Sequence, residues 1–282
     1  MLLIAIREDS PWLPQQVQLA LRTPAVTVTA SPTHWRTLAP GFDVADVAVL
    51  AVGVEVDRLY LSRVDPAKYR FIVRNDPSNS RTLDDWMQRL HAVAVINGSY
   101  FGGDYRPATP VVIDGAPQGP SEYDAKQGAF IMTAGEAHIQ DLARQDWRDA
   151  LHGADEAMVS YPMLIDADGQ SRVSPSRWLA SRSFVAQDRN GMIILGSTPR
   201  GFFSLDRLAA FLKTTPLDLR LVLNLDGGPV ACQGVHVRAY RRMVYGELEM
   251  RVQPGVVQTL PTSSAFHATM PMILAVVPRT VP

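Results

Sequence analysis

Three short segments of the 282-residue chain combine the residue types that bind or transform a polar ligand. In the first, residues 95–103 read Val-Ile-Asn-Gly-Ser-Tyr-Phe-Gly-Gly, so Asn97 and Gly98 directly follow an apolar run. An Asn-Gly pair lets the backbone reverse, and it leaves the Asn97 amide at the end of the preceding strand. We expect Asn97, Gly98 and Tyr100 to contact a ligand. The alternative is a β-turn whose aromatic rings, Tyr100 and Phe101, pack into the core.

The second segment, residues 221–229, reads Leu-Val-Leu-Asn-Leu-Asp-Gly-Gly-Pro. Asn224 and Asp226 are two positions apart, so in a strand they project from the same face. A carboxylate is costly to desolvate there unless it meets a cation, a hydrogen-bond network or a ligand. We therefore predict that Asp226 is catalytic and that Asn224 binds the ligand. Gly227 and Gly228 add consecutive backbone amides that can bind an anion. The alternative is a plain Asp-Gly turn.

The third segment, residues 180–186, reads Ala-Ser-Arg-Ser-Phe-Val-Ala and opens a strand with Arg182. A guanidinium at a strand end can bind a phosphate in a fork or orient a carboxylate such as Asp226. We place Arg182 with Asp226 as the catalytic pair. An exposed ion pair explains Arg182 equally well at this stage.

The remaining titratable residues show no spacing typical of a metal or cofactor site. The single cysteine, Cys232, excludes an intrachain disulfide and a Cys-x-x-Cys zinc site. Residues 166–169 resemble half of a calcium loop but lack the downstream glutamate, so we expect a hairpin turn. We predict no metal and no cofactor. The six histidines lack ligand spacing and are expected to be surface or packed residues: His34, His91, His138, His152, His236 and His267.

Composition narrows the range of partners. With 27 basic and 28 acidic residues, the net charge of -1 gives no general attraction to nucleic acid or to an anionic membrane. No apolar run approaches the ~20 residues of a membrane span. The opening apolar run meets Arg7, Glu8 and Asp9 too early for a signal peptide, so the chain as given is expected not to be exported. The basic cluster at residues 238–251 is expected to be a solvated face.

Hydrophobic patterning predicts the elements that must position the three segments. A helix is expected over residues 83–91, capped by Thr82, and another over residues 205–213, capped by Ser204. The Asp-Arg-Asn-Gly sequence at 188–191 predicts a hairpin turn. Strands are expected over residues 44–52, 57–65, 71–73, 92–96, 111–113, 129–132, 137–139, 158–159, 163–165, 184–186, 192–195, 219–225 and 273–277.

The order of these elements predicts one α+β domain over residues 41–282. No internal repeat and no linker of polar or Gly/Ser composition divides the chain. We expect a mixed, mostly antiparallel β-sheet with three or four helices packed on it. Residues 1–40, rich in proline and threonine, are expected to form an irregular segment or an edge strand. Residues 97–110 should form a long loop on a strand end, where function is often found.

Five segments, taken in order, resemble the phosphodiester glycosidase family, whose type reaction removes N-acetylglucosamine from a phosphodiester on mannose. The family has an Asn-Gly-x-[Phe/Tyr]-Phe segment, a Gly-Pro-x-Leu-like segment, an Arg-[Ser/Thr]-x-x-[Gly/Ala] strand, a helix rich in Leu and Ala, and an Asn-Leu-Asp-Gly-Gly ending. The resemblance covers roughly residues 40–235. The corresponding segments here are residues 97–101, 160–164, 182–186, 205–212 and 224–228.

The resemblance implies hydrolysis of a sugar-1-phosphodiester, carried by a small molecule or a glycan, at the glycosidic carbon. Asp226 would act as base or nucleophile toward the anomeric carbon. Arg182 and the amides near Gly227 would bind the phosphate charge, and Asn97 and Asn224 would hold sugar hydroxyls or the acetamido group. The resemblance also implies an exported or lumenal compartment, against the missing leader, and it leaves the sugar and the oligomeric state open.

Two points of the mechanism stay open. A phosphate leaving group is a weak base, so one carboxylate and one cation could suffice, whereas ordinary glycosidases use two carboxylates. If a second is needed, Asp104, Asp114 and Glu122 lie in or near the first loop, and nothing in the sequence chooses among them.

The chain also departs from the family pattern. Pro229 and Val230 stand where the family continues with Gly-Ser, which removes one backbone donor and one hydroxyl, and Tyr161 stands where the family often has glycine. A catalytically inactive glycan-binding protein on the same fold is therefore one alternative. A hydrolase of ordinary glycosides or of other phosphodiesters is another.

Overall fold

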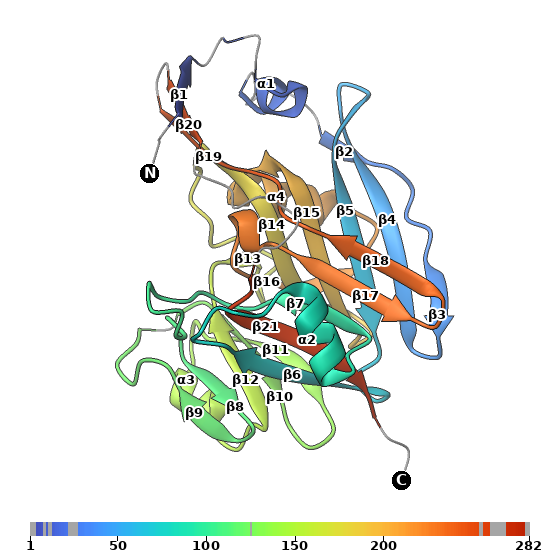
Figure 1. Cartoon of the computed structure of the whole chain (residues 1–282), viewed down its shortest axis with the longest axis vertical. Helices are drawn as coiled ribbons and strands as arrows, with labels where there is room; N and C mark the ends of the chain where they lie inside the picture. The colour runs from blue at the N-terminus through green and yellow to red at the C-terminus, as the bar shows by residue number, and fades with distance from the viewer. Residues whose placement is uncertain are drawn as a thin grey trace.

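The computed structural model describes residues 4–7, 10, 13–21, 28–124, 126–253, 256–259 and 269–279. Its strands are mostly antiparallel and its α-helices number four within the described chain, which confirms the predicted single-domain α+β class. The strands are divided among three sheets rather than gathered in one (Figure 1).

The first and largest sheet is built on long central strands. It contains, with their partners at both edges, β1 (Ile4–Arg7), β2 (Val28–Ala30), β3 (Arg36–Ala39), β4 (Phe42–Ala51), β5 (Val54–Val64), β13 (Met163–Ile165), β14 (Trp178–Asp188), β15 (Ile193–Phe203), β16 (Leu219–Asn224), β19 (Glu249–Gln253) and β20 (Val256–Thr259). Strand β14 pairs with β15 on one side and with both β16 and β19 on the other. It is therefore the strand on which the elements around the site converge.

Two smaller sheets complete the fold. One contains β8 (Val111–Ile113), β9 (Ala116–Gln118), β10 (Gly128–Met132), β11 (Ala137–Asp141) and β12 (Glu156–Ser160). The other contains β6 (Tyr69–Asn75), β7 (Ala94–Asn97), β17 (Gln233–Val237), β18 (Tyr240–Val244) and β21 (Met272–Pro278). Strand β7 is buried along its whole length between β17 and β21, as its uninterrupted apolar run predicts.

The helices are short and cover the sheets. They are α1 (Gln15–Leu21), α2 (Leu83–Leu90), α3 (Trp147–Leu151) and α4 (Leu205–Thr214), with one 3-10 turn, η1 (Gly228–Val230). Helix α2 begins with the predicted capping box, in which Thr82 and Asp85 satisfy each other's backbone amides. Ser204 precedes α4 as predicted, although its hydroxyl makes no capping hydrogen bond. The sequence did not indicate α1 and α3, which are only one to two turns long.

The core joins all three sheets. One cluster of fully buried side chains combines Val44 of the first sheet, Phe130 of the second and Phe71 of the third, and the two phenylalanine rings meet edge to face at 5.2 Å. The predicted hairpin at 188–191 connects β14 to β15, and the Asp188 carboxylate accepts two amides of the turn.

Residues 1–40 contain β1, α1, β2 and β3 in their described part, and β1 pairs with β20. Val17 and Ala20 of α1 are buried in the core cluster of the first sheet, and β2 and β3 pair with β4. Parts of this segment, and the prediction for His267, lie outside the described residues. None of the helices that can be described is long and apolar enough to cross a membrane.

Candidate active site

The three predicted segments meet at one place. Phe184 of β14 is the register partner of Asn224 of β16, and the Leu225 amide continues the pairing by donating to the Ser183 carbonyl at 3.0 Å. The Asp226 amide then donates to the Gly98 carbonyl at 3.1 Å. That bond connects the first sheet to the end of β7 in the third sheet, so the cluster lies at the junction of two sheets.

Asn97 fixes the backbone of Asp226. Its side-chain nitrogen donates to the Asp226 carbonyl at 2.8 Å and to the Gly98 carbonyl at 3.3 Å. Two carbonyl acceptors settle which end of the amide is nitrogen. The Ser183 hydroxyl donates to the same Asp226 carbonyl at 2.9 Å. Asn97 is only 1% exposed, and its side-chain oxygen has no hydrogen-bond partner among the described residues.

Asn224 fixes a pair of tyrosines. Its side-chain nitrogen donates to the Tyr100 hydroxyl at 2.8 Å and to the Tyr161 carbonyl at 3.1 Å. The Tyr100 hydroxyl in turn donates to the Tyr161 carbonyl at 2.9 Å, and the two rings stack with centroids 4.3 Å apart. Tyr161 is 40% exposed, so the stack is partly open to solvent beside the cluster. Burial, and secondarily the charge of Asp226, raises the pKa of Tyr100, which stays a neutral donor.

Asp226 has the most perturbed carboxyl group of the cluster. Burial raises its pKa from 3.8 to about 7, and the negative charge of Glu249 acts in the same direction. The Gly227 amide, which donates to Oδ1 at 2.8 Å, and the charge of Arg182 act in the opposite direction. Asp226 therefore exchanges a proton near neutral pH, as general acid–base groups do.

Arg182 is a buried cation held by carbonyl groups. It is 7% exposed, and it donates from Nε to the Phe203 carbonyl at 3.1 Å and from Nη2 to the Trp178 carbonyl at 2.6 Å. None of the carboxylates in the described chain lies within ion-pair distance of it. Burial lowers its pKa to about 10, so it stays charged at neutral pH. The alternative of an exposed ion pair is thereby excluded.

The two glycines make room for charged side chains. A Cβ on Gly227 would lie 3.2 Å from Arg182 Nη1. A Cβ on Gly228 would lie 2.3 Å from Glu249 Oε2, and Gly228 has a φ of +69°, in the left-handed region that favours glycine. The Gly227 amide donates its hydrogen bond to the Asp226 carboxylate, whereas we predicted that it would bind an anion of the ligand. Binding of an anion by this pair stays a prediction.

Glu249 belongs to the cluster, and the sequence analysis missed it. It lies on β19, opposite Ala180 of β14, and its Oε1 accepts the indole N–H of Trp178 at 2.9 Å. No motif surrounds it in the sequence. Glu249 reaches the cluster through the register between β14 and β19, and the amino-acid pattern does not reveal that register. Trp178 is 40% exposed and was missed for the same reason.

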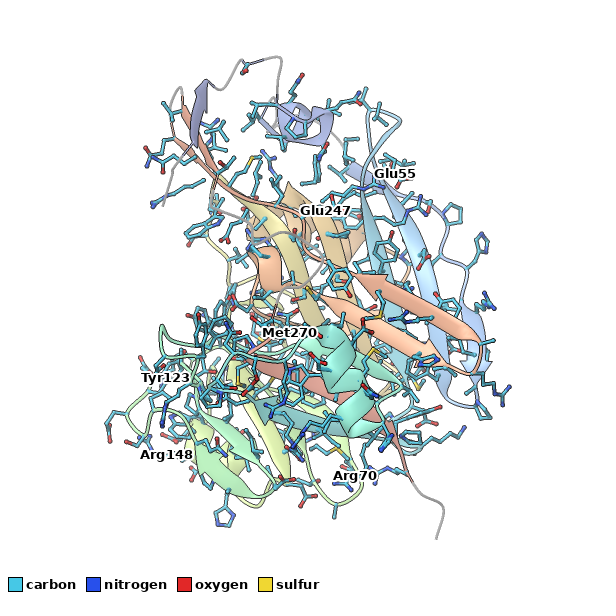
Figure 2. The ribbon with its side chains drawn as sticks, viewed as in Figure 1. Glu55, Arg70, Tyr123, Arg148, Glu247 and Met270 are labelled. Atoms are coloured by element: carbon cyan, nitrogen blue, oxygen red, sulfur yellow. The ribbon has the colours of Figure 1, made fainter. Side chains whose placement is uncertain are left out.

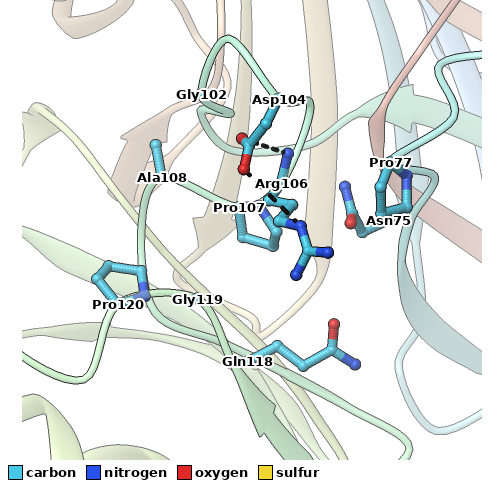
Figure 3. A pocket seen from close by; sticks show the side chains of 10 residues that line it. All are labelled: Asn75, Pro77, Gly102, Asp104, Arg106, Pro107, Ala108, Gln118, Gly119 and Pro120. Carbon is cyan, nitrogen blue, oxygen red and sulfur yellow. Dashed lines mark hydrogen bonds and ion pairs between the residues drawn. The ribbon is translucent and has the colours of Figure 1, made fainter.

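The three carboxylates suggested earlier lie elsewhere. Asp104 lines a separate surface pocket beside Arg106, and its Oδ1 accepts a hydrogen bond from the Arg106 backbone amide at 3.1 Å (Figure 3). Asp114 pairs with Arg74 at 2.8 Å. Glu122 pairs with Arg148. Figure 2 labels Arg148 in the lower part of the molecule and Glu247, two residues before Glu249, in the upper part. None of the three contributes to the charge felt by Asp226.

No group of three potential metal ligands among His, Cys, Asp and Glu occurs in the described part of the chain. The prediction of a reaction without metal or cofactor stays a prediction.

Comparisons with known proteins show what this chain is similar to. Comparison with curated proteins gives no match. Solved structures resemble the fold at low sequence identity: the catalytic domain of zebrafish N-acetylglucosamine-1-phosphodiester alpha-N-acetylglucosaminidase, auto-inhibited by its pro-peptide, matches with a TM-score of 0.57 and 14% identity over 90% of this chain and 84% of that one. A hypothetical protein from Synechocystis matches with a TM-score of 0.55 and 14% identity over 90% of this chain and 68% of that one. A putative exported protein from Burkholderia pseudomallei matches with a TM-score of 0.51 and 11% identity over 91% of this chain and 97% of that one.

The sequence itself carries the stronger evidence. The family model for phosphodiester glycosidases matches residues 90–235, which is more than half of the chain. That range includes Asn97, Arg182, Asn224 and Asp226 and ends before Glu249. The chain therefore belongs to the phosphodiester glycosidase family.

Proposed function

We propose that this protein hydrolyses a sugar-1-phosphodiester at the glycosidic carbon. The observation that carries the proposal is the pair formed by Asp226 and Arg182 on the two sides of Gly227. One is a carboxyl group that exchanges its proton near neutral pH, and the other is a buried cation without a carboxylate partner in the described chain. This pair supplies a base or nucleophile and a positive charge, the two groups that the reaction needs.

The chemistry needs little acid catalysis, because a phosphodiester leaves as the anion of a phosphomonoester. In the base mechanism, ionised Asp226 takes a proton from water while the water oxygen bonds to the anomeric carbon. The bond from that carbon to the phosphate oxygen breaks, and the phosphate oxygen keeps the electron pair. In the nucleophile mechanism, the Asp226 carboxylate bonds to the anomeric carbon while the bond to the phosphate oxygen breaks and that oxygen keeps the electron pair. Water then bonds to the same carbon, the carboxylate leaves with the electron pair of its bond, and the proton of the water passes to solvent. Both mechanisms require the carboxylate form, and Arg182 stabilises the charge on the departing phosphate.

The neighbouring residues orient these groups and shape the place where sugar binds. Asn97 holds the Asp226 backbone, and Asn224 holds the stacked tyrosines. The exposed ring of Tyr161 offers a flat apolar surface of the kind on which a sugar ring packs. In this proposal the two asparagines act mainly through Asp226, Tyr100 and Tyr161, because both amides are almost fully buried.

One observation favours a second candidate, a glycan-binding protein without turnover. The Gly227 amide donates to Asp226, and Pro229, in the 3-10 turn η1 that follows, has no amide hydrogen to donate. A phosphate would then be held by fewer backbone donors than the family pattern offers.

The test is release of free sugar and phosphomonoester from a panel of α-glycosyl-1-phosphodiesters. The parent protein should turn over at least one member, and Asp226→Asn should reduce turnover by three orders of magnitude or more while the protein stays folded. Release of phosphate-free aglycone would indicate cleavage of a different bond. Saturable binding of a diester by the parent without any turnover would instead support the glycan-binding protein.

A further inference from the structure

Strand β19 brings a second acidic side chain to the site. Glu249 is the register partner of Ala180, and Arg182 follows two residues later on the same strand, β14. The Glu249 carboxylate lies over Gly228, so close that a Cβ on that residue would clash with Glu249 Oε2. Gly228 is only two residues beyond Asp226, so the absence of a side chain there is what admits the carboxylate.

The position of Glu249 is fixed by Trp178. The indole N–H donates to Glu249 Oε1 at 2.9 Å, and the main-chain carbonyl of the same tryptophan accepts Arg182 Nη2 at 2.6 Å. One residue therefore positions both the cation and the second carboxylate. The other oxygen, Oε2, accepts no hydrogen bond from the residues that the structure describes.

Four titratable side chains interact with the Asp226 carboxyl. Glu249 comes from β19, Arg182 from β14, Tyr100 from the loop after β7, and Tyr161 from the turn between β12 and β13. Both tyrosines are neutral at neutral pH, because burial raises their pKa values. Arg182 and Glu249 are thus the two charged groups, and they act on Asp226 in opposite directions.

We propose that Glu249 is the second carboxylate of the active site and works as a positioning residue, whose fixed negative charge acts on Asp226 and sets the pH range of the reaction. The role of Asp226 in turnover rests on the proposed function, but the electrostatic coupling between the two carboxyl groups does not. A like charge nearby makes ionisation harder, so Glu249 keeps Asp226 a stronger base than Arg182 alone would allow.

Direct titration of Asp226 tests the coupling without any substrate. Carbon-13 NMR of aspartate-labelled protein follows each carboxyl group with pH, and Asp226→Asn identifies the resonance. Glu249→Gln keeps the shape and an oxygen that can accept the indole N–H, but it removes the charge. We expect the Asp226 midpoint to move to lower pH by on the order of half a unit or more. The matched control is Glu247→Gln on the same segment, whose exposed side chain does not act on Asp226, and it should leave the midpoint unchanged.

Two more variants separate charge from shape. Glu249→Asp keeps the charge and should retain most of the parent midpoint. Trp178→Phe keeps the residue Glu249 but removes the indole donor that holds its carboxylate. The carboxylate is then free to move away from Asp226, and the Asp226 midpoint should shift in the same direction as in Glu249→Gln, by less. An Asp226 midpoint that is the same in the parent, Glu249→Gln and Trp178→Phe would overturn the proposal.

Turnover measurements then separate the coupling between Glu249 and Asp226 from the proposed hydrolysis. If the parent hydrolyses a sugar-1-phosphodiester, the acid limb of its kcat/KM profile should follow the Asp226 midpoint and move to lower pH in Glu249→Gln. If the NMR midpoint moves and no diester is hydrolysed, the coupling stands and the proposed function fails. If turnover occurs and its acid limb stays fixed while Glu249→Gln lowers kcat, Glu249 is structural and the proposal fails.

Discussion

Asp226 carries a raised pKa that also affects the stability of the fold. In the unfolded chain its pKa is about 3.9, whereas in the folded protein it is about 7. Folding therefore favours the protonated form. The stabilising contribution of Asp226 is complete at pH values below its pKa in the unfolded chain. It is lost as the pH rises through its pKa in the folded protein.

We therefore expect the free energy of unfolding of the parent to fall between pH 5 and pH 8, and that of Asp226→Asn to fall less. The difference should be on the order of 2 kcal/mol, reduced from the full shift because Asp226 is partly open to solvent. Urea unfolding at both pH values measures it. Buried Asp57, whose pKa is also raised to about 7, is present in both proteins, so its effect cancels. Parallel pH dependences in the two proteins would contradict the raised pKa of Asp226.

Among the elements, the turn η1 depends on a single glycine. Gly228 has a φ of +69°, and a Cβ there would overlap the Glu249 carboxylate. Gly228→Ala should lower the free energy of unfolding by about 1–3 kcal/mol and displace Glu249, so that the midpoint of Asp226 moves to lower pH. Gly135→Ala is the matched control, because its Cβ would meet nothing within 4 Å and its φ is not positive. Equal effects of the two substitutions on unfolding would contradict this account.

Elements with strong local signals could be predicted from the sequence. The capping box of α2 and the Asp188 hairpin depend on residues three or four positions apart, so their patterns are visible without the fold. Strands β17, β18 and β20 were not predicted, because their polar residues are adjacent or unevenly spaced and interrupt the two-residue alternation typical of a strand. Strand β19 does alternate over Glu249–Gln253, but this five-residue pattern was overlooked. The candidate site divides in the same way. Asp226 could be predicted as a polar residue at the end of a buried strand, whereas Glu249 reaches the site through a strand register.

At the scale of the whole molecule, the site joins two sheets that share one acceptor. The Asp226 carbonyl accepts Asn97 from the third sheet and Ser183 from the first. Asn97→Ala or Ser183→Ala alone leaves that carbonyl with one donor, whereas the double variant leaves it with neither. The double variant should lose more stability than the sum of the single variants, by about 1 kcal/mol or more. Additive losses in a double-mutant cycle of chemical unfolding would show that the two donors do not share the acceptor.

Glu249 lies on a strand beyond residues 90–235, the range matched by the family model, although its carboxylate lies among residues inside that range. The groups that would perform the reaction therefore lie inside the range that the family model matches, and the group that would tune it lies outside that range. Substitutions on β19 could retune such an enzyme to a more acidic or a more alkaline environment while Asn97, Arg182 and Asp226 stay as they are. Adaptation to a new compartment would then need a change in one accessory strand and none in the family motifs.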